Sequence, residues 1–125
     1  MTPKILVVED ELIIASDIQA RLVRMGYDVT ATVSSGEKAI EHLKVASPDL
    51  ILMDLALSGA LDGIETSRRI RDQSDIPIVF LTAHSDDETL RRMMVVDAHD
   101  YLRKPCTLVE LKTTIERIVG VPTSP

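Results

Sequence analysis

Ile5-Leu6-Val7-Val8-Glu9-Asp10 is an apolar run of strand length that ends directly on two carboxylates. Two further runs have the same form: residues 50–53 end on Asp54, and residues 76–81 end on Thr82. Unbroken apolar runs of this length are typical of parallel strands that are covered on both faces. The carboxyl ends of parallel strands lie at one edge of a sheet, so we expect these polar side chains to gather there.

A short fourth run, residues 101–103, leads into Lys104-Pro105, so an ammonium group joins the same edge. Two unit charges about 4 Å apart repel by roughly 1 kcal/mol in water and by about 4 kcal/mol near a protein surface. A site that gathers Glu9, Asp10 and Asp54 is therefore destabilised unless a cation offsets the repulsion. An oxygen-only donor set suits Mg²⁺, with Mn²⁺ as the alternative ion, better than Zn²⁺. These residues predict a Mg²⁺-dependent acceptor for a phosphoryl group.

Amphipathic segments of helix length separate the apolar runs. Residues 11–25 carry apolar side chains at helical spacing, and Gly26 favours a helix stop directly after them. Residues 108–119 follow the same period. Residues 27–33 alternate between apolar and polar positions, as in a strand at the edge of a sheet. Five strands alternating with five helices predict an α/β domain built on a doubly wound parallel sheet.

Capping patterns mark four of the expected helix starts. Residues 34–37, 85–88 and 107–110 each begin with a hydroxyl side chain and end with Glu, which is the capping-box pattern. In this pattern the hydroxyl accepts a hydrogen bond from the third backbone N–H, and the Glu side chain reaches back to the cap. Residues 62–65 are the version that begins with Asp.

Length and composition limit the architecture and the partners. Residues 1–125 fit one domain, and we expect its core at about 4–119, with a tail or the start of a linker at 120–125. The net charge of −6 argues against nucleic acid as the direct partner. No apolar stretch reaches the ~18 residues of a membrane span, so we expect no membrane insertion. A single cysteine, Cys106, and the absence of a signal-peptide pattern favour the cytoplasm.

Five motifs follow one another in a specific order. They are an acidic pair after the first strand, an aspartate after the third, an Asp-Gly pair, a Thr-Ala pair after the fourth strand and an Asp-Tyr-Leu-x-Lys-Pro stretch. In this sequence they are Glu9-Asp10, Asp54, Asp62-Gly63, Thr82-Ala83 and residues 100–105. Over nearly its whole length the chain thus resembles the receiver domain of two-component response regulators.

The resemblance implies a flavodoxin-like fold with five helices and a five-stranded sheet in the order 2-1-3-4-5. It assigns Asp54 as the residue that is phosphorylated by a histidine kinase or a histidine phosphotransfer protein. Mg²⁺ would be held by Asp10, Asp54 and the backbone carbonyl of Ala56, with Glu9 acting through water. The domain would then be a signalling switch, and we expect no enzymatic activity beyond its own phosphorylation and dephosphorylation.

Further residues receive roles from the same resemblance. Thr82 and Lys104 would contact the phosphoryl group, and the peptide bond between Lys104 and Pro105 would be cis. Tyr101 matches an aromatic switch residue that turns inward as Thr82 moves. Phosphorylation would shift the population toward one arrangement of the face formed by the fourth helix, fifth strand and fifth helix, which binds a downstream protein target.

Several positions depart from the common family pattern. The loop after Asp54 lacks the usual Met-Pro and is one residue longer than usual before Asp62-Gly63. Ala56 and His84 each lie two residues past a site residue, and our hypothesis is that they set the lifetime of the acyl phosphate by controlling water access. The apolar residues 93–96 leave three alternatives open: core packing, a surface for a partner protein, or a homodimer contact.

Two other classes of protein are compatible with parts of the pattern. A phosphatase with an aspartate nucleophile requires a second Asp, the general acid, two residues after the first, where this chain has Ala56. A nucleotide or flavin binder requires a Gly-rich or hydroxyl-rich loop after the first strand to bind phosphate. This chain has Glu9, Asp10 and Glu11 there, which would repel a phosphate. The sequence leaves open whether the domain is a stand-alone regulator or a receiver cut from a hybrid kinase or a longer regulator. It names neither the kinase nor the target.

Overall fold

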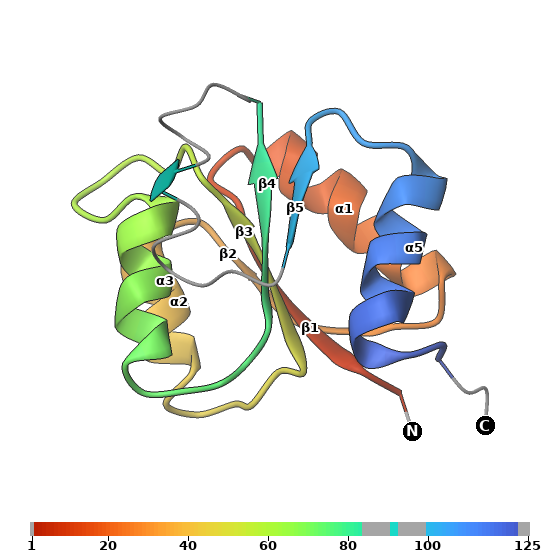
Figure 1. Ribbon diagram of the computed structural model, residues 1–125, viewed down its shortest axis with the longest axis horizontal. Coiled ribbons are helices and arrows are strands. Elements are labelled where there is room, and N and C mark those ends of the chain that lie inside the picture. The colour runs from red at the N-terminus through yellow and green to blue at the C-terminus, as the bar shows by residue number, and fades with distance from the viewer. Residues whose placement is uncertain (1, 84–90, 93–99, 123–125) are drawn as a thin grey trace.

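The computed structural model describes residues 2–83, 91–92 and 100–122, and these form a five-stranded parallel sheet with helices on both faces (Figure 1). The strand order is β2-β1-β3-β4-β5, which confirms the expected flavodoxin-like topology. The strands are β1 (Lys4–Val8), β2 (Asp28–Val33), β3 (Leu50–Asp54), β4 (Ile78–Thr82) and β5 (Asp100–Arg103), and the helices are α1 (Leu12–Arg24), α2 (Gly36–His42), α3 (Gly63–Arg71) and α5 (Leu108–Val119).

Four of the five expected helices lie in the described part of the chain. The remaining one was expected between β4 and β5, after the capping pattern at residues 85–88, and that pattern lies outside the described residues. The apolar residues 93–96 lie outside them as well. The expectation that 27–33 forms an edge strand is confirmed, because β2 is at one end of the sheet.

The sheet buries both of its faces. Ile18 of α1 and Leu111 of α5 pack in one apolar cluster, whereas Ala39 of α2 and Ile64 of α3 pack in the other. Neighbouring residues of a strand point to opposite faces, so the central strands must be apolar at every position. This arrangement explains the unbroken runs of the sequence. The strand residues of the first cluster are Ile5, Val7, Leu50, Leu52, Val79, Leu81 and Leu102, and those of the second are Leu6, Val8, Ile51, Met53, Ile78 and Phe80.

The register of the strands brings their polar ends together. Val8 pairs with Met53, so Glu9 and Asp54 follow the last apolar pair of β1 and β3. Asp54 itself lies opposite Leu81 of β4, one residue before Thr82. Because all these strands are parallel, their carboxyl ends lie at the same edge, as the sequence predicts.

The helix caps follow the sequence at two sites and depart from it at a third. Thr107 and Glu110 form the complete capping box of α5, and the Asp62 side chain caps α3. Helix α2, however, is capped by Ser35 instead of Ser34, so the expected box is wrong. With the helix starting one residue later, Glu37 no longer occupies the third position. Its carboxylate accepts a hydrogen bond from the distant backbone N–H of Leu61 at 3.1 Å instead.

Gly63 lets the start of α3 approach the end of β3. A Cβ at this position would lie 2.2 Å from the carbonyl oxygen of Asp54 and 2.8 Å from the Cα of Leu55. Both atoms belong to the backbone, so no side-chain rotation relieves the overlap. The Gly63 N–H also donates to the Leu55 carbonyl at 3.2 Å. The Asp-Gly motif is thus a packing requirement of the segment that carries Asp54.

We expect Gly63→Ala to lower the free energy of unfolding by about 1–3 kcal/mol, the usual cost of forcing an extra methyl group into a packed interior. Urea unfolding of the metal-free domain measures this change. Gly120→Ala is the control, because its methyl group would meet nothing within 4 Å and only its φ of 86° is unfavourable. A Gly63→Ala variant that is as stable as the parent would contradict the close approach.

Tyr27, directly before β2, contacts Gly120 at the C-terminal end of α5. The residue is 4% exposed, and its hydroxyl donates to the carbonyl oxygen of Gly120 at 3.0 Å. Burial, together with the nearby charge of Glu116, raises the pKa of Tyr27 to about 12. The buried ring therefore favours the protonated hydroxyl, which is the form that can donate.

The raised pKa of Tyr27 gives a pH-dependent contribution to stability. The contribution is complete below the ordinary pKa of 10.0 and is lost as the pH rises through about 12. At pH 8 we expect Tyr27→Phe to lower the free energy of unfolding by about 1 kcal/mol, the typical value of one hydrogen bond. Between pH 10 and 11 the difference between parent and variant should shrink in urea unfolding experiments. A difference that stays constant from pH 8 to 11 would show that this hydroxyl does not titrate as described.

Candidate functional site

Three carboxylates meet at the carboxyl edge of the sheet. One oxygen from each of Glu9, Asp10 and Asp54 lies within 4.8 Å of the others. Glu9 is 1% and Asp54 3% exposed, whereas Asp10 is half-buried. The loop after β1 and the last residue of β3 thus bring together acidic groups that are more than 40 residues apart in the sequence, as was predicted.

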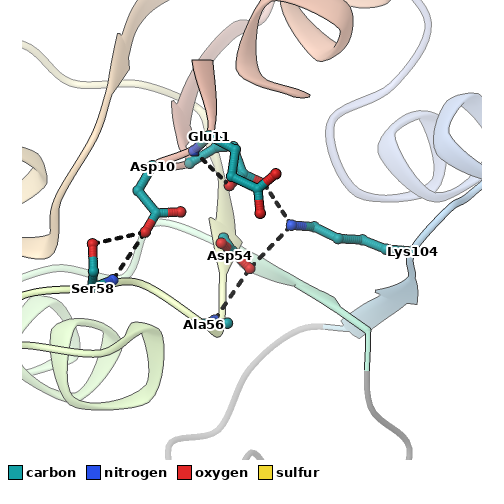
Figure 2. A network of polar contacts seen from close by, with 7 residues as sticks. Asp10, Glu11, Asp54, Ala56, Ser58 and Lys104 are labelled. Atoms are coloured by element: carbon teal, nitrogen blue, oxygen red, sulfur yellow. Dashed lines mark hydrogen bonds and ion pairs between the residues drawn. The ribbon is translucent and has the colours of Figure 1, made fainter. Parts of the chain in front are cut away.

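Lys104 lies between two of these carboxylates (Figure 2). Its Nζ is 2.5 Å from Glu9 Oε1 and 3.2 Å from Asp54 Oδ1. The backbone of Lys104 is held next to the end of β4, because its N–H donates to the Thr82 carbonyl at 2.8 Å and continues the pairing of β5 with β4. Three carboxylates and one ammonium leave a formal charge of −2 at the site.

The environment shifts the pKa values of Glu9 and Lys104. Burial raises the pKa of Glu9, although its hydrogen bonds with Lys104 and with the backbone of Glu11 act in the opposite direction. Burial alone would lower the pKa of Lys104, but the hydrogen bond with Glu9 and the charge of Asp54 outweigh it and raise the pKa. Lys104 therefore stays an ammonium at neutral pH and remains the counter-charge of the two buried carboxylates.

Asp10 is held by a residue that sequence reasoning did not select. Ser58 donates two hydrogen bonds to Asp10 Oδ2, one from its backbone N–H at 3.0 Å and one from its hydroxyl at 2.9 Å. Burial is the largest single influence and acts to raise the pKa of Asp10, but the hydrogen bonds to its carboxylate, those from Ser58 foremost, together outweigh it and lower the pKa. The only signal in the sequence was that Ser58 belongs to the loop that departs from the family pattern.

The loop between β3 and α3 has contacts on three sides. Near its start, the Ala56 N–H donates to Asp54 Oδ1 at 3.2 Å. In its middle Ser58 contacts Asp10, and near its end Leu61 donates to Glu37 of α2. The extra residue of this loop therefore belongs to an ordered segment that lines the acidic site.

The remaining predicted residues are placed as follows. Thr82 is 1% exposed at the end of β4, and Tyr101 on β5 is 43% exposed. The peptide bond between Lys104 and Pro105 is cis, as the family resemblance implied. His84 lies outside the described residues, so only Ala56 of the pair that was expected to control water access is placed.

The donor set fits a hard divalent cation. It consists of three carboxylates, and with the Lys104 ammonium beside them the site keeps a formal charge of −2. Carboxylate oxygens completed by water are the ligands that Mg²⁺ prefers. Glu9, Asp10 and Asp54 are the side chains that could hold such an ion. A thiol- or imidazole-preferring metal would find no ligand among these three.

Comparisons with known proteins agree with the geometry. A family model for the response regulator receiver domain matches residues 5–116. The chain is 40% identical over 103 residues to the transcriptional regulatory protein AfsQ1 of Streptomyces coelicolor, covering 82% of this chain and 45% of that protein. It is 38% identical over 120 residues to PhoP of Bacillus subtilis, the alkaline phosphatase synthesis transcriptional regulatory protein, covering 95% and 49%. The chain thus spans about half the length of these curated relatives.

Solved structures of receiver domains have the same fold as this chain. The receiver domain of a sensor histidine kinase from Pseudomonas aeruginosa superimposes with a TM-score of 0.87 at 33% identity, covering 96% of this chain and 99% of that one. That structure has a magnesium ion coordinated in its active-site cleft. This chain belongs to the response regulator receiver domain family, and its role is that of a phospho-accepting domain in two-component signalling. None of the helices among the described residues has the length and apolarity that crossing a bilayer requires.

We expect Asp54→Asn to stabilise the metal-free domain. The substitution removes one of three crowded negative charges and, with it, the ion pair between Lys104 and Asp54, but it leaves the contact between Lys104 and Glu9 in place. The relieved repulsion exceeds the lost attraction to Lys104, and we expect a net gain of about 1 kcal/mol, well below the roughly 4 kcal/mol of a single repulsion near a protein surface. Thermal unfolding in a chelating buffer measures the change, with the exposed Asp75→Asn as the matched control. An Asp54→Asn midpoint at or below that of the parent would contradict the repulsion argument.

Proposed function

We propose that Asp54 accepts a phosphoryl group from the phosphohistidine of a histidine kinase or a histidine phosphotransfer protein. In this step an Asp54 carboxylate oxygen forms a bond to phosphorus while the bond between phosphorus and the histidine nitrogen breaks. The electron pair of that bond stays on the histidine ring. The observation that carries the proposal is the position of the Asp54 carboxylate, buried among two further carboxylates and an ammonium at the end of β3.

The neighbouring residues have separate roles in this proposal. Lys104 offsets the charge of Asp54 before transfer and that of a phosphoryl oxygen after it. Thr82, at the end of the adjacent strand, supplies a hydroxyl for a second phosphoryl oxygen. Asp10, Asp54 and the Ala56 carbonyl would hold Mg²⁺, or Mn²⁺ as an alternative, with Glu9 acting through water. The bound cation supplies positive charge where the phosphoryl oxygens collect negative charge.

The surface beside the site supports docking of a phosphodonor. Leu12 and Ile13, at the start of α1, are 77% and 86% exposed. Next to them lies an apolar groove of about 620 Å³, whose lining includes Ile14, Pro105 and also Lys104. Because Lys104 contacts Asp54, a donor helix seated in this groove would bring its phosphohistidine to the acceptor. We therefore assign the groove to the helix that carries the donor histidine.

The output of the switch is proposed to use the face that includes β5 and α5, together with the segment that precedes β5. Tyr101 is exposed on this face, and the Arg117 side chain of α5 forms an ion pair with Asp100 of β5. Tyr101 would turn inward as Thr82 moves toward the phosphoryl group. A downstream protein or a second copy of the chain would recognise the rearranged face, without direct contact with nucleic acid.

The proposal treats residues 4–119 as the receiver domain and 120–125 as a tail or the start of a linker. The curated relatives are about twice as long as the part that matches this chain. Both alternatives from the sequence are kept: the domain would act as a stand-alone regulator, or within a hybrid kinase or longer regulator. The proposed compartment is the cytoplasm. Ala56 and His84 retain their hypothetical role in setting the lifetime of the acyl phosphate.

The decisive experiment is intact-mass measurement after incubation with acetyl phosphate and Mg²⁺. We expect the parent to gain one phosphoryl group, because the small donor needs only the acceptor and its cation. Asp54→Asn should gain none, and the exposed Asp75→Asn should behave like the parent. Omission of Mg²⁺ should abolish the gain. A parent that gains no mass under any of these conditions would be a receiver-shaped binding domain instead.

A further inference from the structure

We infer that Ser58 is a positioning residue of the metal site, which fixes the orientation of Asp10 before the cation binds. The inference rests on the proposed Mg²⁺ site and deepens it, because it names a residue outside the acidic set that controls cation affinity. It concerns the loop that departs from the family pattern, so it describes a property of this particular chain.

The geometry of the contact supports a positioning role. The hydroxyl and the backbone N–H of Ser58 lie 2.9 and 3.0 Å from the same oxygen, Asp10 Oδ2. Two donors on one oxygen, from different directions, restrict rotation of the carboxylate more than either donor alone. In Figure 2 the second oxygen of Asp10 points away from Ser58, toward the side on which Asp54 lies. Ser58 therefore presents that oxygen to the space shared by the three carboxylates.

Asp10 is the member of the acidic set that most needs such support. Glu9 and Asp54 are 1% and 3% exposed, and Lys104 contacts both of them. Asp10 is half-buried, so solvent leaves its side chain more freedom. Ordering a free side chain during binding reduces affinity, whereas a preformed orientation does not. Residues that hydrogen-bond to metal ligands influence metal affinity in this way.

A second contact of the same loop allows a sharp test. Glu37 of α2 accepts a hydrogen bond from the Leu61 N–H at 3.1 Å, three residues after Ser58. Glu37 thus holds the loop through its far end, whereas Ser58 holds Asp10 directly. If orientation of Asp10 sets the affinity, loss of the Ser58 hydroxyl must weaken cation binding more than loss of the Glu37 carboxylate.

The experiment is a magnesium titration of the full chain, followed by amide signals in two-dimensional NMR spectra, for the parent and four variants. We expect Ser58→Ala to raise the Mg²⁺ Kd by ~3–10-fold. This is less than the ~10–100-fold typical of losing such a partner, because the backbone N–H of residue 58 remains. Ser58→Thr keeps a hydroxyl and should restore the parent value. Glu37→Ala and the cap variant Ser35→Ala should lower the free energy of unfolding, by about 1 kcal/mol for the lost cap. Neither residue contacts Asp10, so we expect their Mg²⁺ Kd to stay within about two-fold of the parent value.

The outcomes separate this inference from the proposed function. A parent that binds Mg²⁺ and a Ser58→Ala variant with the same Kd would overturn the inference and leave the site intact. A Glu37→Ala Kd that rises as much as that of Ser58→Ala would also overturn it, because general order of the loop would then explain the effect. A parent that binds no Mg²⁺ would overturn the metal site and the inference together. Unfolding midpoints in chelating buffer check that all variants are folded at the titration temperature.

Discussion

Three carboxylates can share one edge of a sheet only if their mutual repulsion is offset, and in this domain Lys104 provides much of the offset. Its ammonium contacts Glu9 at 2.5 Å and Asp54 at 3.2 Å, and those contacts keep its pKa raised despite burial. One ammonium does not neutralise three carboxylates, so a formal charge of −2 remains. The residual charge makes the edge receptive to a divalent cation, and the same ammonium is available to a phosphoryl group.

The position of Lys104 depends in turn on the sheet. Residues 54 and 104 are far apart in the chain, and they meet because β4 pairs with both β3 and β5 in parallel register. The hydrogen bond from the Lys104 N–H to the Thr82 carbonyl extends that register just beyond β5. The apolar clusters on the two faces hold the strands in this order. The core of the domain therefore determines the spacing of its charges.

The loop between β3 and α3 connects the acidic site with the helices on one face. Ser58 contacts Asp10, Leu61 contacts Glu37 of α2, and Gly63 packs against the Asp54 carbonyl. A change at the Asp54 carboxylate is thus adjacent to contacts that define where α3 begins. Asp62, which caps α3, also pairs with Arg92 at 2.8 Å, so the same helix start reaches the segment before β5. The start of α3 is therefore in contact both with the segment that carries Asp54 and with the segment before β5.

The sequence by itself determined the positions of the strands, the burial of the central strands on both faces, the acidic set, and the capping box of Thr107 and Glu110. These features depend on side-chain periodicity and on contacts within one helical turn, which are readable from neighbouring residues. Only the tertiary structure decided that Ser58 holds Asp10 and that Glu37 binds Leu61 instead of completing a capping box. Those partners are 48 and 24 residues apart. Their meeting depends on the path of an irregular loop, and periodicity and local propensity do not encode that path.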